Sequence, residues 1–305
     1  MKRIENVTIV GVGLIGGSFA LAIKQAGFSG KITGCDNAAV LRTAGAHGAL
    51  DRSEEDLVAA VRDADLVVLA APVQANVALL ATIAPHISPD SLITDVGSTK
   101  SEIAVNAKEL FGSDALRKFL PGHPIAGREV SGVENADAML FRGAPWVLTP
   151  VGGRHALIAP EFSLGMHREF IEMLESIGAR VVVTTPERHD RVLAFTSHLP
   201  QLVSTALATT VQRELGGRSE LRDLSGRGLR EMIRLAKSDP QLWSEISASN
   251  IENIQEALSL MERNLAALRE SLGTQGFRQL FEEGIALDPD AEPAPADGTD
   301  PPHFG

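Results

Sequence analysis

The chain has 305 residues, a formal net charge of −11, 44% hydrophobic residues and 22% charged residues. This length and composition are typical of a globular protein with two domains. An acidic chain repels phosphate backbones, so the charge argues against nucleic-acid binding but leaves small anionic substrates open.

The sequence gives no sign of export or membrane insertion. Cys35 is the single cysteine, so no internal disulfide can form. The first residues lead directly into an apolar run at Val7, without the features of a signal peptide, and no apolar run is long enough to cross a bilayer. We therefore expect a cytoplasmic protein.

Short apolar runs alternate with amphipathic stretches in the first part of the chain. The runs begin at Val7, Lys31, Ala64, Ser91, Ala144 and Ala179. Continuous Val, Ile and Leu runs are typical of strands buried on both faces, and their spacing leaves room for helices between them. The pattern predicts an α/β domain over residues 1–185, with a Rossmann-type doubly wound, mainly parallel sheet.

After Pro186 the strand-like runs stop, and the chain reads as helices to about Gly273. We expect an all-α substrate and dimerisation domain over residues 186–285. One apolar stripe steps alternately by three and four residues, which favours packing within the chain or against a second subunit. The stripe consists of Ile251, Ile254, Leu258, Met261, Leu265, Leu268 and Leu272. Residues 286–305 are rich in Pro, Asp and Ala, and we expect a disordered tail.

A glycine-rich turn directly follows the first expected strand. Gly11, Gly13 and Gly16 form G-V-G-L-I-G, in which the glycines allow a tight turn, approach of a pyrophosphate and close helix packing. Asp36 ends the second expected strand, where a carboxylate binds ribose hydroxyls and repels a 2′-phosphate. The pattern favours NAD over NADP; the alternative is a glycine turn that binds no nucleotide. The expected cofactor-binding residues are Gly11, Gly13, Leu14, Ile15, Gly16, Asp36, Ala71, Pro72 and Ser98.

Four further motifs carry polar groups. They are DVGSTK from Asp95, GHPIAGREVSG from Gly122, SHLP from Ser197 and LREMIRLAKSDPQLW from Leu229. In this order the motifs resemble the prephenate and arogenate dehydrogenases of tyrosine biosynthesis, to about Leu280. The resemblance implies a two-domain homodimer that joins through its helical domain and oxidises a cyclohexadienyl substrate with NAD.

The resemblance also implies roles for individual residues. His123 would be the catalytic base, a task that suits the near-neutral pKa of histidine. Ser98 would lie between nicotinamide and the substrate hydroxyl, His198 would bind substrate, and Arg234 would pair with a substrate carboxylate. The remaining substrate-binding residues implied are Glu129, Arg230 and Glu231. No metal is expected.

Taken without the resemblance, several of these residues have simpler interpretations. Ser98 could cap a helix that starts near Lys100, His198 could be structural within an apolar helix, and Arg234 could belong to a solvated face. Arg128 departs from the small residue that many relatives have beside Glu129. His47, His86, His155, His167 and His189 receive no functional role.

We therefore expect NAD-dependent oxidative decarboxylation of prephenate to 4-hydroxyphenylpyruvate, with arogenate as a further or preferred substrate left open. One rival class is the β-hydroxyacid dehydrogenases, which need a helical lysine base. Lys237 is the only lysine after Lys118 and falls in a KSDP turn, which weakens that rival. A second rival, an NAD-sensing protein without catalysis, would have no need of His123.

Overall fold

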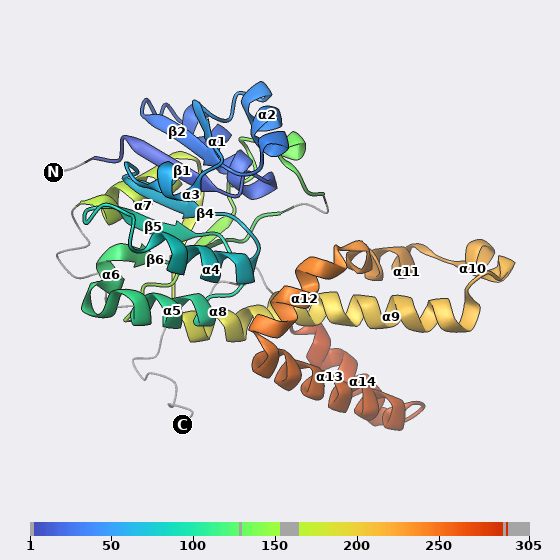
Figure 1. The fold of residues 1–305 in the computed structure, drawn as a ribbon. Coiled ribbons are helices and arrows are strands. Elements are labelled where there is room, and N and C mark those ends of the chain that lie inside the picture. The colour runs from blue at the N-terminus through green and yellow to red at the C-terminus, as the bar shows by residue number, and fades with distance from the viewer. Residues whose placement is uncertain (1–2, 128–129, 153–164, 289–290, 292–305) are drawn as a thin grey trace. The chain divides into compact units, whose positions relative to one another are not determined.

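The computed structural model describes residues 3–127, 130–152, 165–288 and 291 (Figure 1). The chain divides into two compact units, Met1–Gln255 and Glu256–Gly305. None of the helices in the described part of the chain combines the length and apolarity that a bilayer crossing requires.

A six-stranded parallel sheet forms the centre of the first unit. Its strands, in spatial order, are β3 (Arg52–Glu54), β2 (Lys31–Cys35), β1 (Asn6–Val10), β4 (Leu66–Leu69), β5 (Leu92–Asp95) and β6 (Phe119–Leu120). Every residue of β4 and β5 is buried, as expected for strands covered on both faces. The predicted doubly wound α/β architecture is confirmed.

Helices cover the two faces of this sheet and create two separate cores (Figure 1). Side chains alternate along a strand, so Ile9 and Val68 enter one core while Val10 and Leu69 enter the other. The helices of this part are α1 (Leu14–Gln25), α2 (Ala38–Ala46), α3 (Leu57–Val61), α4 (Val73–Ile83), α5 (Ser101–Phe111), α6 (Ala115–Lys118) and α7 (Met166–Ser176).

A second, three-stranded sheet follows β6. It consists of β7 (Gly122–Pro124), β8 (Pro145–Leu148) and β9 (Arg180–Val183), with β7 antiparallel to β8 and β8 parallel to β9. The apolar runs predicted β8 and β9, but β7 carries no apolar run. This strand places His123 opposite Val147.

The first unit continues as helices, as predicted. They are α8 (Pro186–Leu193), a π-helical turn η4 (Ala194–His198), α9 (Leu199–Leu215), α10 (Ser219–Leu224), α11 (Arg227–Met232), the 3-10 turn η5 (Leu235–Lys237) and α12 (Pro240–Ser249). An apolar groove of about 700 Å³ lies between α9 and the following helices α10 and α11.

Helix α13 (Ile251–Ser271) begins in the first unit, and α14 (Gln275–Ile285) lies in the second. The predicted apolar stripe therefore lies on α13 from Ile251 to Leu268, and its last residue, Leu272, directly follows the helix. The residues of the stripe that belong to the second unit are half-buried or exposed, with Leu265 52% and Leu272 64% exposed. Most of the expected tail lies outside the described residues.

Candidate active site

The glycine turn lies between β1 and α1, at the carboxyl edge of the six-stranded sheet. Gly11 has a φ of +91°, and a Cβ there would lie 2.7 Å from the Ala70 carbonyl carbon. A Cβ at Gly16 would lie 2.2 Å from the Gly11 oxygen, so this glycine allows the close packing of α1. A Cβ at Gly13 would meet nothing within 4 Å, so its backbone faces open space that a pyrophosphate can approach.

Asp36 lies beside this turn and is held in place by it. Its carboxylate accepts hydrogen bonds from the backbone N–H of Val12 (2.8 Å) and of Asn37 (2.7 Å). The neighbouring cavity has a volume of about 450 Å³. Its lining includes five of the predicted cofactor residues, namely Gly11, Gly13, Asp36, Ala71 and Pro72. The open approach at Gly13 fits the pyrophosphate of NAD, and the carboxylate in the same cavity fits the hydroxyls of its adenosine ribose.

Leu14 and Ile15 begin α1 and are half-buried, outside the lining of that cavity. Ser98 is also half-buried, in the loop between β5 and α5. The described structure therefore brings together only part of the predicted cofactor set in one cavity.

A buried ion pair joins the Ser98 loop to β7. Lys100 Nζ pairs with Asp95 and donates to the Gly122 carbonyl oxygen at 2.8 Å. Asp95 also accepts from the backbone N–H of Gly97 at 2.8 Å and of Gly122 at 3.2 Å. Burial lowers the pKa of Lys100, whereas attraction by Asp95 opposes that shift. These contacts fix the loop that carries Ser98 against the strand that carries His123.

The amino end of α5 is capped from a distant part of the chain. Asp190, on α8, accepts hydrogen bonds from the backbone N–H groups of Lys100 and Ser101, both at 2.8 Å. A carboxylate is well suited to this place because it satisfies free N–H groups and opposes the positive end of the helix dipole. The alternative in which Ser98 caps the helix is therefore not what the structure shows.

His123 is connected to the same carboxylate through a second histidine. Its Nδ1 lies 2.8 Å from His189 Nε2, and His189 Nδ1 lies 2.8 Å from Asp190 Oδ1. Burial, and then repulsion from His189, Lys100 and His198, lowers the pKa of His123 well below its usual value. The ring is therefore neutral at pH 7, the state in which a histidine can accept a proton.

His198 is fully buried at the end of the π-helical turn, and its ring faces Trp243 edge to face. Asn250 Nδ2 donates to the Asp190 carbonyl oxygen (2.8 Å) and lies 3.2 Å from His198 Nδ1. An amide nitrogen can only donate, so Nδ1 accepts and the neutral ring carries its proton on Nε2. Burial lowers the pKa of His198 to about 4. At neutral pH His198 is a hydrogen-bond donor.

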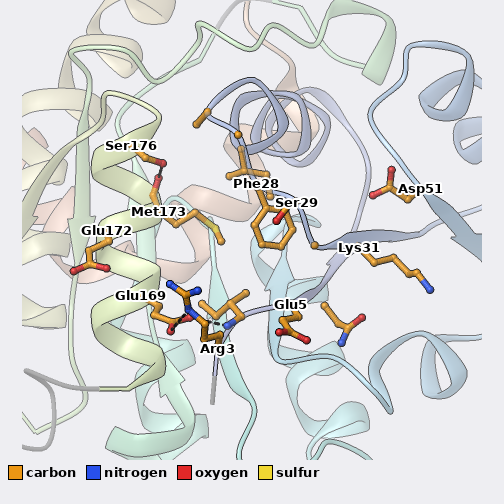
Figure 2. A pocket seen from close by; sticks show the side chains of 16 residues that line it. Arg3, Glu5, Phe28, Ser29, Lys31, Asp51, Glu169, Glu172, Met173 and Ser176 are labelled. Atoms are coloured by element: carbon orange, nitrogen blue, oxygen red, sulfur yellow. Dashed lines mark hydrogen bonds and ion pairs between the residues drawn. The ribbon is translucent and has the colours of Figure 1, made fainter. Parts of the chain in front are cut away.

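A larger cavity lies at the opposite, amino edge of the six-stranded sheet. It has a volume of about 790 Å³ and is lined by the beginnings of β1 and β2, the end of α1 and one face of α7. Figure 2 shows its charged side chains, among them Arg3, Lys31 and Asp51, spread around the rim. The described residues of this cavity include no histidine or cysteine. We therefore assign the active site to the carboxyl edge.

Residues 19–183 match the family "Prephenate dehydrogenase, nucleotide-binding domain", and residues 185–283 match "Prephenate dehydrogenase, dimerization domain". A prephenate dehydrogenase of Lactococcus lactis subsp. cremoris is 32% identical over 92% of this chain and 75% of its own length. The chain belongs to the prephenate dehydrogenase family.

Solved structures agree with this assignment. A prephenate dehydrogenase from A. aeolicus, in complex with hydroxyphenyl propionate and NAD+, gives a TM-score of 0.81 at 33% identity, covering 93% of this chain and 96% of that one. A Synechocystis arogenate dehydrogenase gives 0.75 at 28% identity, covering 92% and 96%. This chain is an NAD-dependent dehydrogenase that acts on a small molecule.

Three further predicted substrate residues, Arg230, Glu231 and Arg234, lie in the helical part. Arg234 is exposed just before η5, in a segment tied to α9 because Gln201 donates to the Leu235 carbonyl oxygen at 2.8 Å. Glu231 is exposed on α11 and pairs with Arg227 at 2.7 Å. Arg230 is exposed and donates to the Ser225 carbonyl oxygen at 3.4 Å. Arg128 and Glu129 lie outside the described residues.

Sequence reasoning missed the groups that support the two histidines. It gave no role to His189, and it did not consider Asp190 or Asn250. The adjacent His-Asp pair, eight residues before SHLP, is the signal that could have drawn attention to them. Both residues of the pair are only 1% exposed, and buried titratable groups require partners.

Proposed function

We propose that this chain catalyses the NAD-dependent oxidative decarboxylation of prephenate, giving 4-hydroxyphenylpyruvate, CO₂ and NADH. The observation that carries the proposal is His123, a neutral histidine fixed at the carboxyl edge of a dinucleotide-binding sheet. Ligands of such sheets bind at this edge, so a base here can act on a substrate beside the cofactor.

The reaction requires only a few groups from the protein. Prephenate is a cyclohexadienol with two carboxylates, and loss of its ring carboxylate as CO₂ aromatises the ring once C4 has become a ketone. Bound NAD would accept the hydride from C4, held by the glycine turn and by Asp36. The chain must supply a base for the C4 hydroxyl, a hydrogen-bond donor and an anchor for a carboxylate.

His123 would take the proton of the C4 hydroxyl. Ser98, in the loop tied to β7 through Lys100, would hydrogen-bond the same hydroxyl. His198 would donate its Nε2 proton to a substrate oxygen, a role supported by its contact with Asn250. Arg234 would pair with a substrate carboxylate, as a guanidinium does well. Arg128, Glu129, Arg230 and Glu231 would border the substrate's side chain.

We propose that residues 1–185 form the NAD-binding domain, residues 186–285 the substrate and dimerisation domain, and residues 286–305 a tail. The proposed division is supported by the two family matches, which meet between residues 183 and 185.

We also propose a homodimer through the helical domain. Exposed apolar side chains support it, because Leu265, Leu272 and Phe281 would otherwise remain in water. The name of the matching family domain supports it as well. Leu265→Glu should convert the dimer to monomers in sedimentation velocity, whereas Asn264→Glu, on a neighbouring exposed position, should not. A wild-type monomer at micromolar concentration would contradict the proposal.

Arogenate is the alternative substrate, since it differs from prephenate only in carrying an amino acid side chain. The likeness to the Synechocystis arogenate dehydrogenase keeps it open. The test is NADH formation measured side by side with the two substrates. We expect a higher kcat/KM with prephenate; no NADH from either substrate would refute the proposed function, and a higher value with arogenate would reverse the substrate assignment.

A further inference from the structure

A continuous line of contacts runs from His123 back into the protein. His123 Nδ1 meets His189 Nε2, His189 Nδ1 meets Asp190 Oδ1, and both distances are 2.8 Å. His189 and Asp190 are each 1% exposed, so water does not compete for these bonds. The three residues come from two elements, β7 and α8, and His123 and His189 are 66 positions apart in sequence.

The carboxylate sets the direction of every bond in this line. Burial alone would raise the pKa of Asp190, but hydrogen bonds from His189 and Ser101 outweigh it and the pKa is lowered. An ionised carboxylate only accepts, so His189 Nδ1 must carry a proton. In a neutral His189 the other nitrogen, Nε2, is then an acceptor. It can accept only from a proton on His123 Nδ1, which leaves Nε2 of His123 with a free lone pair.

We propose that His189 and Asp190 are positioning residues that hold the proton of His123 on Nδ1 and so make Nε2 the base. This inference rests on the proposed function, because it assigns the atom of His123 that accepts the substrate's hydroxyl proton. The bond that forms is Nε2–H and the bond that breaks is the substrate O–H. No proton has to leave His123 Nδ1 for the step to balance.

The same line stabilises the charge that His123 gains. A protonated His123 lies near the positive charge of Lys100, which is itself paired with the negative charge of Asp95. Its Nδ1–H donates to His189, which donates to Asp190, and such bonds strengthen when the donor becomes charged. The negative charge of Asp190 thus opposes the repulsion from Lys100.

Asp190 also makes hydrogen bonds that support the fold, so it is a poor first choice for substitution. It caps α5 through Lys100 and Ser101, and its carbonyl oxygen accepts from Asn250, the partner of His198. A change at Asp190 would disturb the fold and both histidines together. His189 touches only His123 and Asp190 through its ring nitrogens and is therefore the cleaner site for a test.

One alternative protonation state would reverse the role of His123. If His189 carried protons on both nitrogens, His123 Nδ1 would have to accept, and the neutral ring would hold its proton on Nε2. That nitrogen could then donate to the substrate but could not act as a base. The two states differ in the ¹⁵N chemical shifts of the His123 ring, whichever substrate the enzyme uses.

The experiment uses the full-length protein labelled with ¹⁵N-histidine, with His123 signals assigned by their loss in His123→Asn. We expect wild-type His123 to be neutral with its proton on Nδ1. In His189→Leu, which offers no acceptor, we expect a mixture of tautomers. We also expect kcat to fall by roughly 10- to 1000-fold, within the range of general-base effects, while KM changes by only a few-fold.

Two further variants guard against a merely structural explanation. His189→Gln keeps a carbonyl oxygen that can accept from Nδ1, so it should restore part of the lost kcat. His167→Gln, at a buried histidine whose Nε2 lies 3.1 Å from the Leu116 carbonyl oxygen, should leave kcat and the His123 signals unchanged. A wild-type proton on Nε2, or an unchanged tautomer and kcat in His189→Leu, would overturn the inference. Because the tautomer is read without substrate, lack of activity towards prephenate would refute the proposed function alone.

Discussion

The two edges of the six-stranded sheet differ in the state of their charged groups. At the amino edge, the cavity in Figure 2 is the larger of the two, and some of its charged groups form ion pairs at the surface, as Asp51 does with Lys24 at 2.7 Å. At the carboxyl edge, Asp95, Lys100, His189 and Asp190 are buried and joined to one another. Cavity size therefore does not locate the chemistry of this molecule, whereas connected buried titratable groups do.

The strongest test of this contrast is to change one residue at each edge. His123→Asn keeps hydrogen bonding but removes the base, so kcat should fall by about 10²- to 10⁴-fold while NAD affinity changes little. Lys31→Ala, at the rim of the amino-edge cavity, should leave kcat within a few-fold. Steady-state kinetics and NAD titration measure both. Equal kinetic effects of the two substitutions would show that the carboxyl edge is not the site of the chemistry.

Buried histidines also make the protein sensitive to acid. Burial lowers the pKa of both His167 and His198 to about 4, below the value of 6.5 that applies when the chain unfolds. Between these values the unfolded state binds more protons, so the free energy of unfolding should fall as the pH drops from about 6.5 towards 4. The slope should approach about 1.4 kcal/mol per pH unit for each histidine.

Urea unfolding at several pH values measures that slope. His167→Gln, on the helix that borders the amino-edge cavity, should reduce the slope without changing kcat. His198→Gln should reduce the slope and also raise the KM for prephenate. A free energy of unfolding that stayed constant over this pH range would show that neither histidine is held neutral.

As proposed above, Arg234 would bind a substrate carboxylate from the helical part of the chain. A charge-assisted hydrogen bond contributes about 1.5 kcal/mol at an exposed position, so Arg234→Ala should raise the KM for prephenate by roughly 10-fold. Arg213→Ala, at an exposed position on α9, is the matched control and should have little effect. An unchanged KM for Arg234→Ala would show that another residue, such as Arg230, binds the carboxylate.

Substitution of Asp36 is expected to have the smallest effect of these changes, and the effect should be on cofactor preference. Its carboxylate would repel a 2′-phosphate, so the wild-type enzyme should prefer NAD to NADP, and Asp36→Ala should narrow that preference by a few-fold. Asp51→Ala, at the amino edge, should leave the preference unchanged. The ratio of kcat/KM for the two cofactors is the measurement, and equal wild-type values would remove the role given to Asp36.

The contrast between the edges also explains what the sequence could predict. The glycine turn, Asp36 and the buried strands depend on residues close together in the chain, and the sequence predicted them. The contact of His123 with His189 and the capping of α5 by Asp190 join residues 66 and 90 positions apart. No local pattern encodes such pairs, because they form only when α8 packs beside α5.

Short polar strands were missed for a related reason. β3 and β7 have three residues each and lack an apolar run, so pairing with a neighbouring strand defines them rather than their own sequence. For β7 this matters to function, because the antiparallel pairing with β8 sets the position of His123. The family resemblance pointed to His123, but the sequence could not reveal the support behind it.

His123 at the carboxyl edge is proposed to act as the base in an oxidation that is coupled to loss of CO₂ from prephenate. The most direct test measures NADH and CO₂ from the same prephenate reaction, with wild-type enzyme and with His123→Asn. We predict one NADH and one CO₂ for each prephenate consumed, and the loss of both products together in His123→Asn. NADH without CO₂, or a His123→Asn enzyme that forms both at the wild-type rate, would contradict the account.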